Sequence, residues 1–193
     1  MKTIYLDCGM GAAGDMLTAA LLELCDRPEA VLETLNRAFA GKAVLSVRKD
    51  QKCGITGNHA TVTVDGETEG EPPCHEQRGH EQTDHERHAD VLAGHEQHTE
   101  HTCEHPHGHP RRHTSVAEVR AFLREVSLPE EVIRDALAVY DLIAEAEARV
   151  HGRPVENIHF HEVGTMDAVA DISAFCLLLN ELSVDRILAS PVN

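Results

Sequence analysis

The pattern of apolar and polar residues predicts strands and helices on both sides of a long polar segment. Before that segment, short apolar or alternating runs typical of strands occupy residues 2–6, 43–49 and 59–64. Apolar residues at helical spacing predict helices at residues 16–24 and 26–39. The second helix begins with the start pattern Asp26-x-x-Glu29, with Pro28 in its first turn.

Beyond the polar segment, the same pattern predicts three helices and two strands. Ser115-x-x-Glu118 and Ser127-x-x-Glu130 are helix-start patterns, and the second helix is expected to end at Gly152. The apolar stripe expected on that second helix is Ile133, Leu137, Tyr140 and Ala144. The remaining elements are a strand at 158–163, a helix at 166–182 and a strand at 184–189.

These elements predict an α/β (or α+β) fold, a sheet of about four to five strands with helices packed on it. We expect residues 1–64 and 114–193 to form one α/β domain, interrupted by an insert at 65–113. The 49 insert residues include Val91 and Leu92 as their only large aliphatics, and 12 acids against four Arg give a formal charge of -8. So little apolar area cannot offset the entropy of ordering, so we expect the insert to be disordered without metal.

Composition narrows the function classes. The chain is 41% hydrophobic but 3% aromatic, and its net charge of -16 disfavours nucleic-acid and anionic membrane partners. It has no 18-residue apolar run and no apolar leader, so neither a membrane span nor a signal peptide is expected. The six cysteines are widely spaced without a C-x-x-C pair, which favours reduced thiols in the cytoplasm.

Histidine is concentrated in the insert. Eleven of the 15 histidines lie within residues 75–113, among them His105, His107 and His109. Because neutral imidazole is a common ligand of Ni, Cu and Zn, we predict that this tract binds such metals at several weak sites. The alternative is a solvated linker that happens to be rich in histidine.

The turn at residues 7–15 is a second candidate for binding. Gly9, Gly11 and Gly14 match G-x-G-x-x-G between a strand and a helix, where backbone N–H groups can approach a phosphate. The acid expected on a second strand is missing, so a dinucleotide site is weakly supported. Asp15 disfavours a bare phosphate, but Asp7 and Asp15 together can hold a divalent cation with a phosphate. The alternative is a tight turn without a ligand.

A third candidate lies near the carboxyl end. On a strand, His159 and His161 share one face roughly 7 Å apart, so they can share one metal ion or one anionic substrate. Glu162 lies on the other face or at the strand end. Asp167 and Asp171 share a helix face and can supply oxygen ligands, a base or orientation of an imidazole. A polar network at a buried strand end is the alternative.

Four short motifs follow one another along the chain. Residues 5–16 contain D-C-x-x-G-x-x-G-D-M, and residues 48–57 contain R-x-x-x-x-C-G-I-T-G. Residues 146–152 contain A-E-A-x-V-H-G, and residues 159–172 contain H-F-H-E-V-G-x-x-D-x-x-x-D-I. With the His-rich insert between the second and third blocks, the chain resembles the LarC family of nickel-insertion proteins, which serve the nickel-pincer cofactor of lactate racemase.

The resemblance implies a nickel chelatase or cyclometallase of the lyase class. It inserts Ni²⁺ into pyridinium-3,5-bisthiocarboxylic acid mononucleotide, forming two Ni–S bonds and one Ni–C bond, and uses CTP with Mn²⁺ or Mg²⁺. Loss of the ring proton requires a base, for which His159, His161, Glu162 and Asp167 are candidates. Candidate ligands of nickel or of another cation are Asp7, Asp15, His159, His161 and Asp171.

The resemblance also bears on completeness and partners. Family members continue past the residues that end this chain into a second domain, to which CTP binding is attributed. We therefore expect an N-terminal part that needs a separate or missing C-terminal LarC polypeptide and binds no CTP tightly alone. It is either a natural piece made by frameshifting or a truncated or degraded chain, and a homo-oligomer stays open.

Two other function classes stay open. One is a non-catalytic nickel or zinc storage protein or metallochaperone that acts through the His-rich tract. The other is a nucleotide-binding oxidoreductase that uses the glycine turn. A nickel-loading GTPase is disfavoured, because the sequence lacks G-x-x-x-x-G-K-[ST].

Overall fold

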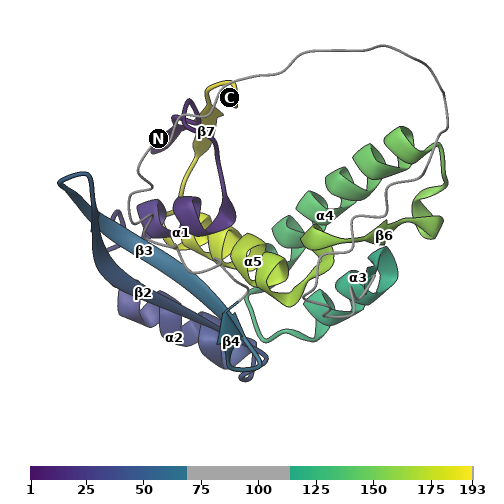
Figure 1. The fold of residues 1–193 in the computed structure, drawn as a ribbon, viewed down its shortest axis with the longest axis horizontal. Helices are drawn as coiled ribbons and strands as arrows, with labels where there is room; N and C mark the ends of the chain where they lie inside the picture. Colours follow the sequence, from purple (N-terminus) through teal and green to yellow (C-terminus); the bar gives the residue numbers. More distant parts are fainter. Residues whose placement is uncertain (69–113, 193) are drawn as a thin grey trace, which may run out of the picture. The chain divides into compact units, whose positions relative to one another are not determined.

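The computed structural model describes residues 1–68 and 114–192, which belong to one compact unit (Figure 1). The predicted disorder of the insert and the metal-binding tract with His105, His107 and His109 lie outside the described residues, except at residues 65–68. There the expectation was wrong: Glu67 and Thr68 form a short strand after a turn through Asp65 and Gly66, both with positive φ. Within the described part, no helix is long and apolar enough to cross a membrane.

The mixed α/β class is confirmed, but the strands do not form one sheet of four to five strands. In the described residues they divide among three small sheets. The first pairs β1 (Thr3–Leu6) with β7 (Arg186–Ala189) in parallel. The second is the antiparallel sheet of β2 (Ala43–Lys52), β3 (Ile55–Val64) and β4 (Glu67–Thr68). The third pairs β5 (Thr114–Ser115) with β6 (His159–Phe160).

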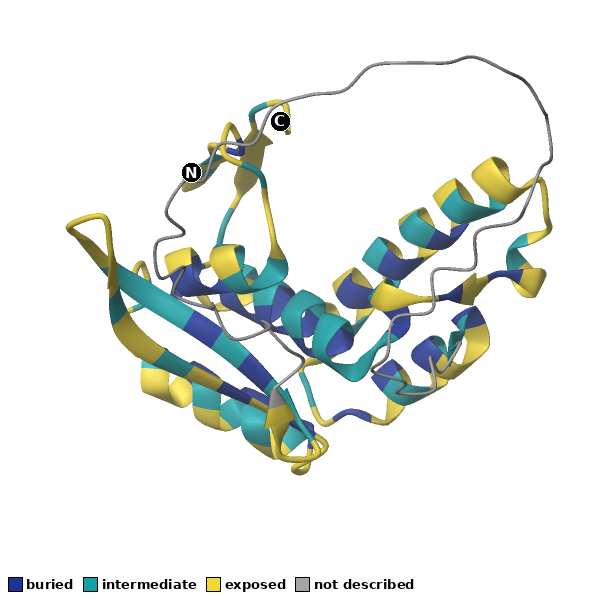
Figure 2. Ribbon diagram, in the orientation of Figure 1, coloured by how far each residue is buried: buried dark blue, intermediate teal, exposed yellow. Residues whose placement is uncertain are grey.

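Helix α5 (Met166–Glu181) is the element around which the others pack. It contacts α1, α2, α4, β2 and β3, and Figure 2 shows its buried positions in dark blue. Small and aliphatic residues let these neighbours approach, because Ala174, Leu177 and Leu178 are at most 1% exposed. The other α-helices of residues 1–68 and 114–192 are α1 (Gly14–Leu22), α2 (Pro28–Ala38), α3 (Val116–Glu125) and α4 (Glu130–His151).

Local helix-end chemistry was predicted in part. The capping box at Ser115 and Glu118 is present, and α4 ends at left-handed Gly152 as expected. The predicted starts at Asp26 and Ser127 were wrong, because α2 and α4 begin after Arg27 and Pro129 without a side-chain cap. The buried stripe of α4 is also shifted; it consists of Val132, Ala136, Tyr140 and Ala144.

The strand predicted at residues 158–163 is much shorter than expected. His161 leaves the extended conformation at φ -95 and ψ -98, and the 3₁₀ turn η2 (Glu162–Gly164) follows. The turn is closely packed, because a Cβ on Gly164 would lie 2.6 Å from the Cβ of Phe160 and 3.1 Å from that of Thr114. The chain therefore turns here instead of extending the strand.

We predict that Gly164→Ala lowers the free energy of unfolding by about 1–3 kcal/mol, because the added methyl group overpacks the turn against Phe160. Urea denaturation followed by circular dichroism measures this change. Gly57→Ala is the matched control, since no atom lies within 4 Å of a Cβ at that position. Equal stability of the two variants would contradict the close packing described for η2.

Candidate functional site

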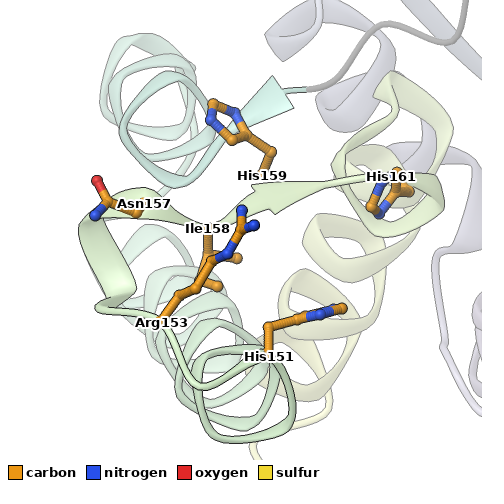
Figure 3. Close-up of a pocket in the computed structure, with 6 residues that line it drawn as sticks. All are labelled: His151, Arg153, Asn157, Ile158, His159 and His161. Atoms are coloured by element: carbon orange, nitrogen blue, oxygen red, sulfur yellow. The ribbon is translucent and has the colours of Figure 1, made fainter.

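An open pocket lies where the end of α4 meets β6 (Figure 3). Its volume is about 490 Å³. The residues that line it are His151, Arg153, Asn157, Ile158, His159 and His161. The pocket thus combines three imidazoles, one guanidinium and one amide around an aliphatic side chain.

Local backbone structure positions these side chains. After α4, left-handed Gly152 reverses the chain, and the N–H groups of Gly152 and Arg153 donate to the carbonyl of Ala148. The 3₁₀ turn η1 (Val155–Asn157) then leads into β6. From there burial alternates: Ile158 and Phe160 are 3% and 1% exposed, whereas His159 and His161 are exposed. The predicted alternation around the two histidines therefore holds even though the strand is short.

The buried side of β6 packs against α4, and this contact fixes the position of the strand. Phe160 contacts the buried ring of Tyr140 at a centroid distance of 5.6 Å. The Tyr140 hydroxyl donates to the carbonyl oxygen of Val163 at 3.0 Å. Burial and the charges of Asp167 and Asp171 raise the pKa of Tyr140, so this hydroxyl keeps its proton at neutral pH. The segment with both histidines is thereby held at Phe160, between them, and at Val163, just after them.

The pocket contrasts with the acidic chain around it. Its six lining residues include no Asp or Glu. Acids lie just outside: Glu147 Oε2 is 3.1 Å from His151 Nε2, one helical turn before it. Hydrogen bonds from Ser115, with a smaller effect of the His159 charge, lower the pKa of Glu118, so this nearby carboxylate is ionised.

The imidazoles line one pocket but do not converge. Figure 3 shows their rings pointing in different directions, because the chain turns at His161. Within residues 1–68 and 114–192, no three His, Cys, Asp or Glu side chains lie close enough to hold one metal ion. The structure thus brings His159 and His161 to one pocket, but it does not bring Asp171 to them as a third ligand. Their role as metal ligands stays a prediction.

Carboxylates gather separately, where α1 contacts α5. A Cβ on Gly14 would lie only 2.6 Å from Asp171 Oδ2, so glycine is needed for this approach. Burial first, and then the charges of Asp15 and Asp167, raise the pKa of Asp171 to about 6. The Oδ1 atoms of Asp167 and Asp171 are buried, and the part of the chain that the structure describes offers them no hydrogen-bond partner.

The glycine turn uses its own N–H groups. Gly9 N–H donates to Asp7 Oδ1 at 3.1 Å, and Gly11 N–H donates to the Cys8 carbonyl at 3.0 Å. Gly11 adopts a φ of 90°, which favours glycine. Asp7 is exposed, and it is not among the charges that act on Asp171. The N–H groups of Gly9 and Gly11 are therefore used within the turn, and phosphate binding by Gly9, Gly11 and Gly14 stays a prediction.

His151, Arg153 and Asn157 are pocket residues that the sequence did not single out as a site. His151 belongs to the block A-E-A-x-V-H-G, which was the available indication. Nothing in local periodicity shows that the end of α4 faces β6. The position of Glu162 is also defined. It begins η2, and its carbonyl oxygen accepts hydrogen bonds from the Thr165 hydroxyl and N–H.

Comparison with known proteins gives a family match. A family model described as "Nickel insertion protein" matches residues 4–193. A relative from Synechococcus sp. (strain JA-2-3B'a(2-13)), also named for nickel insertion, is 35% identical over 99% of this chain and 38% of its own length. No solved structure matches.

Two further relatives carry a more specific name, "Pyridinium-3,5-bisthiocarboxylic acid mononucleotide nickel insertion protein". The one from Akkermansia muciniphila is 32% identical over all of this chain and 39% of its own length. The one from Geobacillus kaustophilus is also 32% identical, again over all of this chain and 39% of its own length. The chain therefore spans about two-fifths of the length of the curated relatives it matches.

We predict that Asp171→Asn raises the free energy of unfolding at pH 8 by about 1–2 kcal/mol, allowing for partial solvent screening. The folded-state pKa of Asp171 is about 6 against a usual 3.8, so the protonated carboxyl favours the folded state. Wild-type stability from this group is therefore lost as pH rises from about 4 to above 6, and the amide removes that loss. Urea denaturation at pH 4 and pH 8 measures the difference.

The control for this prediction is Asp26→Asn, which neutralises an exposed aspartate between α1 and α2. This variant is expected to change stability by the same small amount at both pH values. A gain for Asp171→Asn that is no larger at pH 8 than at pH 4 would contradict the raised pKa.

Proposed function

The chain belongs to the family of nickel insertion proteins, and we propose that it is the N-terminal part of an enzyme that inserts nickel into pyridinium-3,5-bisthiocarboxylic acid mononucleotide. The observation that carries the proposal is the pocket between α4 and β6, which gathers His151, His159 and His161 with Arg153. Imidazole suits nickel, and a guanidinium suits an anionic mononucleotide. Nickel is a substrate here, not a resident metal.

The pocket imidazoles do not converge on one point, and this arrangement suits the transfer of nickel to the organic substrate. In the expected product, two sulfurs and one carbon of the organic substrate bind nickel, so the protein must give up its own ligands. A site with three converging imidazoles would compete with that outcome, whereas one or two from His159 and His161 would release the ion. The absence of a three-ligand group in the described residues supports this proposal.

Formation of the Ni–C bond also requires removal of a proton from the ring carbon. We assign this role to His159 or His161, because both are exposed at the pocket and imidazole accepts a proton near neutral pH. Asp167 is half-buried beside Asp171, and Glu162 begins the turn that follows. These two carboxylates are therefore weaker candidates for the base.

CTP with Mn²⁺ or Mg²⁺ is proposed for the whole enzyme and not for this part. Hard cations bound to a triphosphate require oxygen ligands in a defined geometry. Asp15, Asp167 and Asp171 do not form a three-ligand group, and Gly9 and Gly11 use their N–H groups within the glycine turn. These residues do not fit a metal–triphosphate site. We propose that a C-terminal LarC polypeptide, covalently joined or separate, supplies it.

We predict that His159→Ala and His161→Ala each lower the rate of nickel insertion at least tenfold, because each removes a pocket imidazole needed for nickel or for the proton. The rate is followed by product absorbance after mixing the chain with nickel, CTP, the substrate and the C-terminal portion of a relative. His59→Gln, on β3, is the control and should leave the rate unchanged. Wild-type rates for both pocket variants would refute the site.

A deletion tests the alternative of metal storage. Removing residues 75–113 takes away eleven histidines. We predict that the rate at saturating nickel is retained while the chain binds fewer nickel ions in equilibrium dialysis, because the tract concentrates nickel and the pocket uses it. A storage protein would show no insertion by either the full chain or the deletion variant.

A further inference from the structure

We infer that Arg153 forms a phosphate subsite in the pocket between α4 and β6, which binds the 5′-phosphate of a pyridinium mononucleotide. The inference rests on the proposed function, since it assigns one end of that substrate to a named residue. Arg153 was not singled out from the sequence, and it is not needed as a metal ligand.

The charge around the pocket supports an anionic ligand. The chain carries a net charge of -16, so it repels a mononucleotide everywhere except where acids are locally missing. No acid lines this pocket, and Arg153 is its one permanently charged lining residue. Some other arginines pair with carboxylates, as Arg120 does with Asp141 at 2.6 Å. Among the described residues, no carboxylate pairs with the Arg153 guanidinium, which leaves its donors available.

The backbone of Arg153 is fixed before any ligand binds. Its N–H donates to the carbonyl of Ala148 at 3.1 Å, left-handed Gly152 precedes it, and Pro154 follows with φ -59. Figure 3 shows its side chain extending past Ile158 toward β6. A guanidinium fork matches two phosphate oxygens, and a fixed backbone lowers the entropy lost on binding.

The pocket also has room for both ends of the substrate. A volume of about 490 Å³ is within the range of sites that take small ligands. In Figure 3, Asn157 and His161 lie at opposite sides of the pocket with the Arg153 side chain between them, and the Asn157 amide points away from the guanidinium. A phosphate held by Arg153 leaves the imidazoles of the pocket for the other end of the substrate, where nickel must reach its sulfurs.

The glycine turn is the competing phosphate site. Its Gly9 and Gly11 N–H groups already donate within the turn, and Asp15 adds a negative charge to the first turn of α1. A phosphate bound by the remaining N–H groups would lie close to that carboxylate. No carboxylate lines the pocket.

Calorimetric titration of the whole chain with nicotinic acid mononucleotide, without nickel, tests the subsite. We expect Arg153→Ala to weaken binding roughly 10- to 100-fold, the usual effect of losing a charge-assisted hydrogen bond. Arg153→Lys should bind with intermediate affinity, because it keeps the charge but loses the fork. Arg149→Ala is the matched control: Arg149 lies four residues earlier, and its Nε donates to the Glu145 carbonyl.

Three other ligands identify the group that is recognised. The riboside without its phosphate should bind weakly to wild type and equally to Arg153→Ala. Inorganic phosphate should compete with the mononucleotide in wild type only. CTP should bind more weakly than the mononucleotide; tighter CTP binding that depends on Arg153 would overturn the assignment to a mononucleotide.

The outcomes separate the subsite from the proposed function. Equal mononucleotide affinity of wild type and Arg153→Ala, or no binding by wild type at millimolar concentration, overturns the subsite even if nickel insertion is observed. Phosphate-dependent binding that Arg153→Ala loses supports the subsite, even if the completed enzyme inserts no nickel and the proposed function fails. Unchanged circular dichroism of the variant shows that the loss is local.

Discussion

The contact of Tyr140 with the segment that joins α4 to α5 is the interaction on which both candidate sites depend. Its ring packs on Phe160 and its hydroxyl donates to Val163, and both groups are inside the fold. His159 and His161 flank Phe160, and the same segment continues into the first turn of α5 with Asp167. One buried aromatic side chain therefore sets the positions of the pocket imidazoles and of the carboxylates together, although they belong to different surfaces.

The two groups differ in what they can bind. The imidazoles and Arg153 face solvent at an open pocket, where a borderline-soft cation and an anion can arrive together. Asp167 and Asp171 each have a buried oxygen, and Asp171 lies against Gly14 of α1. Burial, and then the charges of Asp15 and Asp167, raise the pKa of Asp171. Partial protonation near pH 6 reduces the repulsion that two adjacent carboxylates would otherwise add to the fold. The carboxylate pair therefore shapes the α1–α5 contact, and the chemistry we propose is confined to the pocket.

The parts that could be predicted from the sequence are those that local chemistry decides. Ser115 and Glu118 form their capping box, and Gly152 ends α4, because each needs only neighbouring residues. The family was also identified correctly, because its four blocks are ordered motifs. Strand pairing was not predictable, because α5 and not a continuous sheet is the common packing surface, and periodicity says nothing about which strands pair. Arg153 was missed for the same reason: its place in the pocket depends on a contact between segments.

An enzyme that inserts nickel must bind the organic substrate and nickel at the same time. It must also bind nickel weakly enough to release the ion to that substrate. If the phosphate carries most of the binding energy for the organic substrate, the reacting ring needs no strong contact of its own, and the ring position can be used for chemistry. Nickel can then be bound by few protein ligands, since the sulfurs of an already positioned ring complete its coordination. A rigid site with several imidazoles would stabilise the ion before transfer and raise the barrier. In the function we propose, an open pocket with a fixed guanidinium and divergent imidazoles would not hold nickel too tightly, and this agrees with the finding that no three-ligand group lies among the described residues.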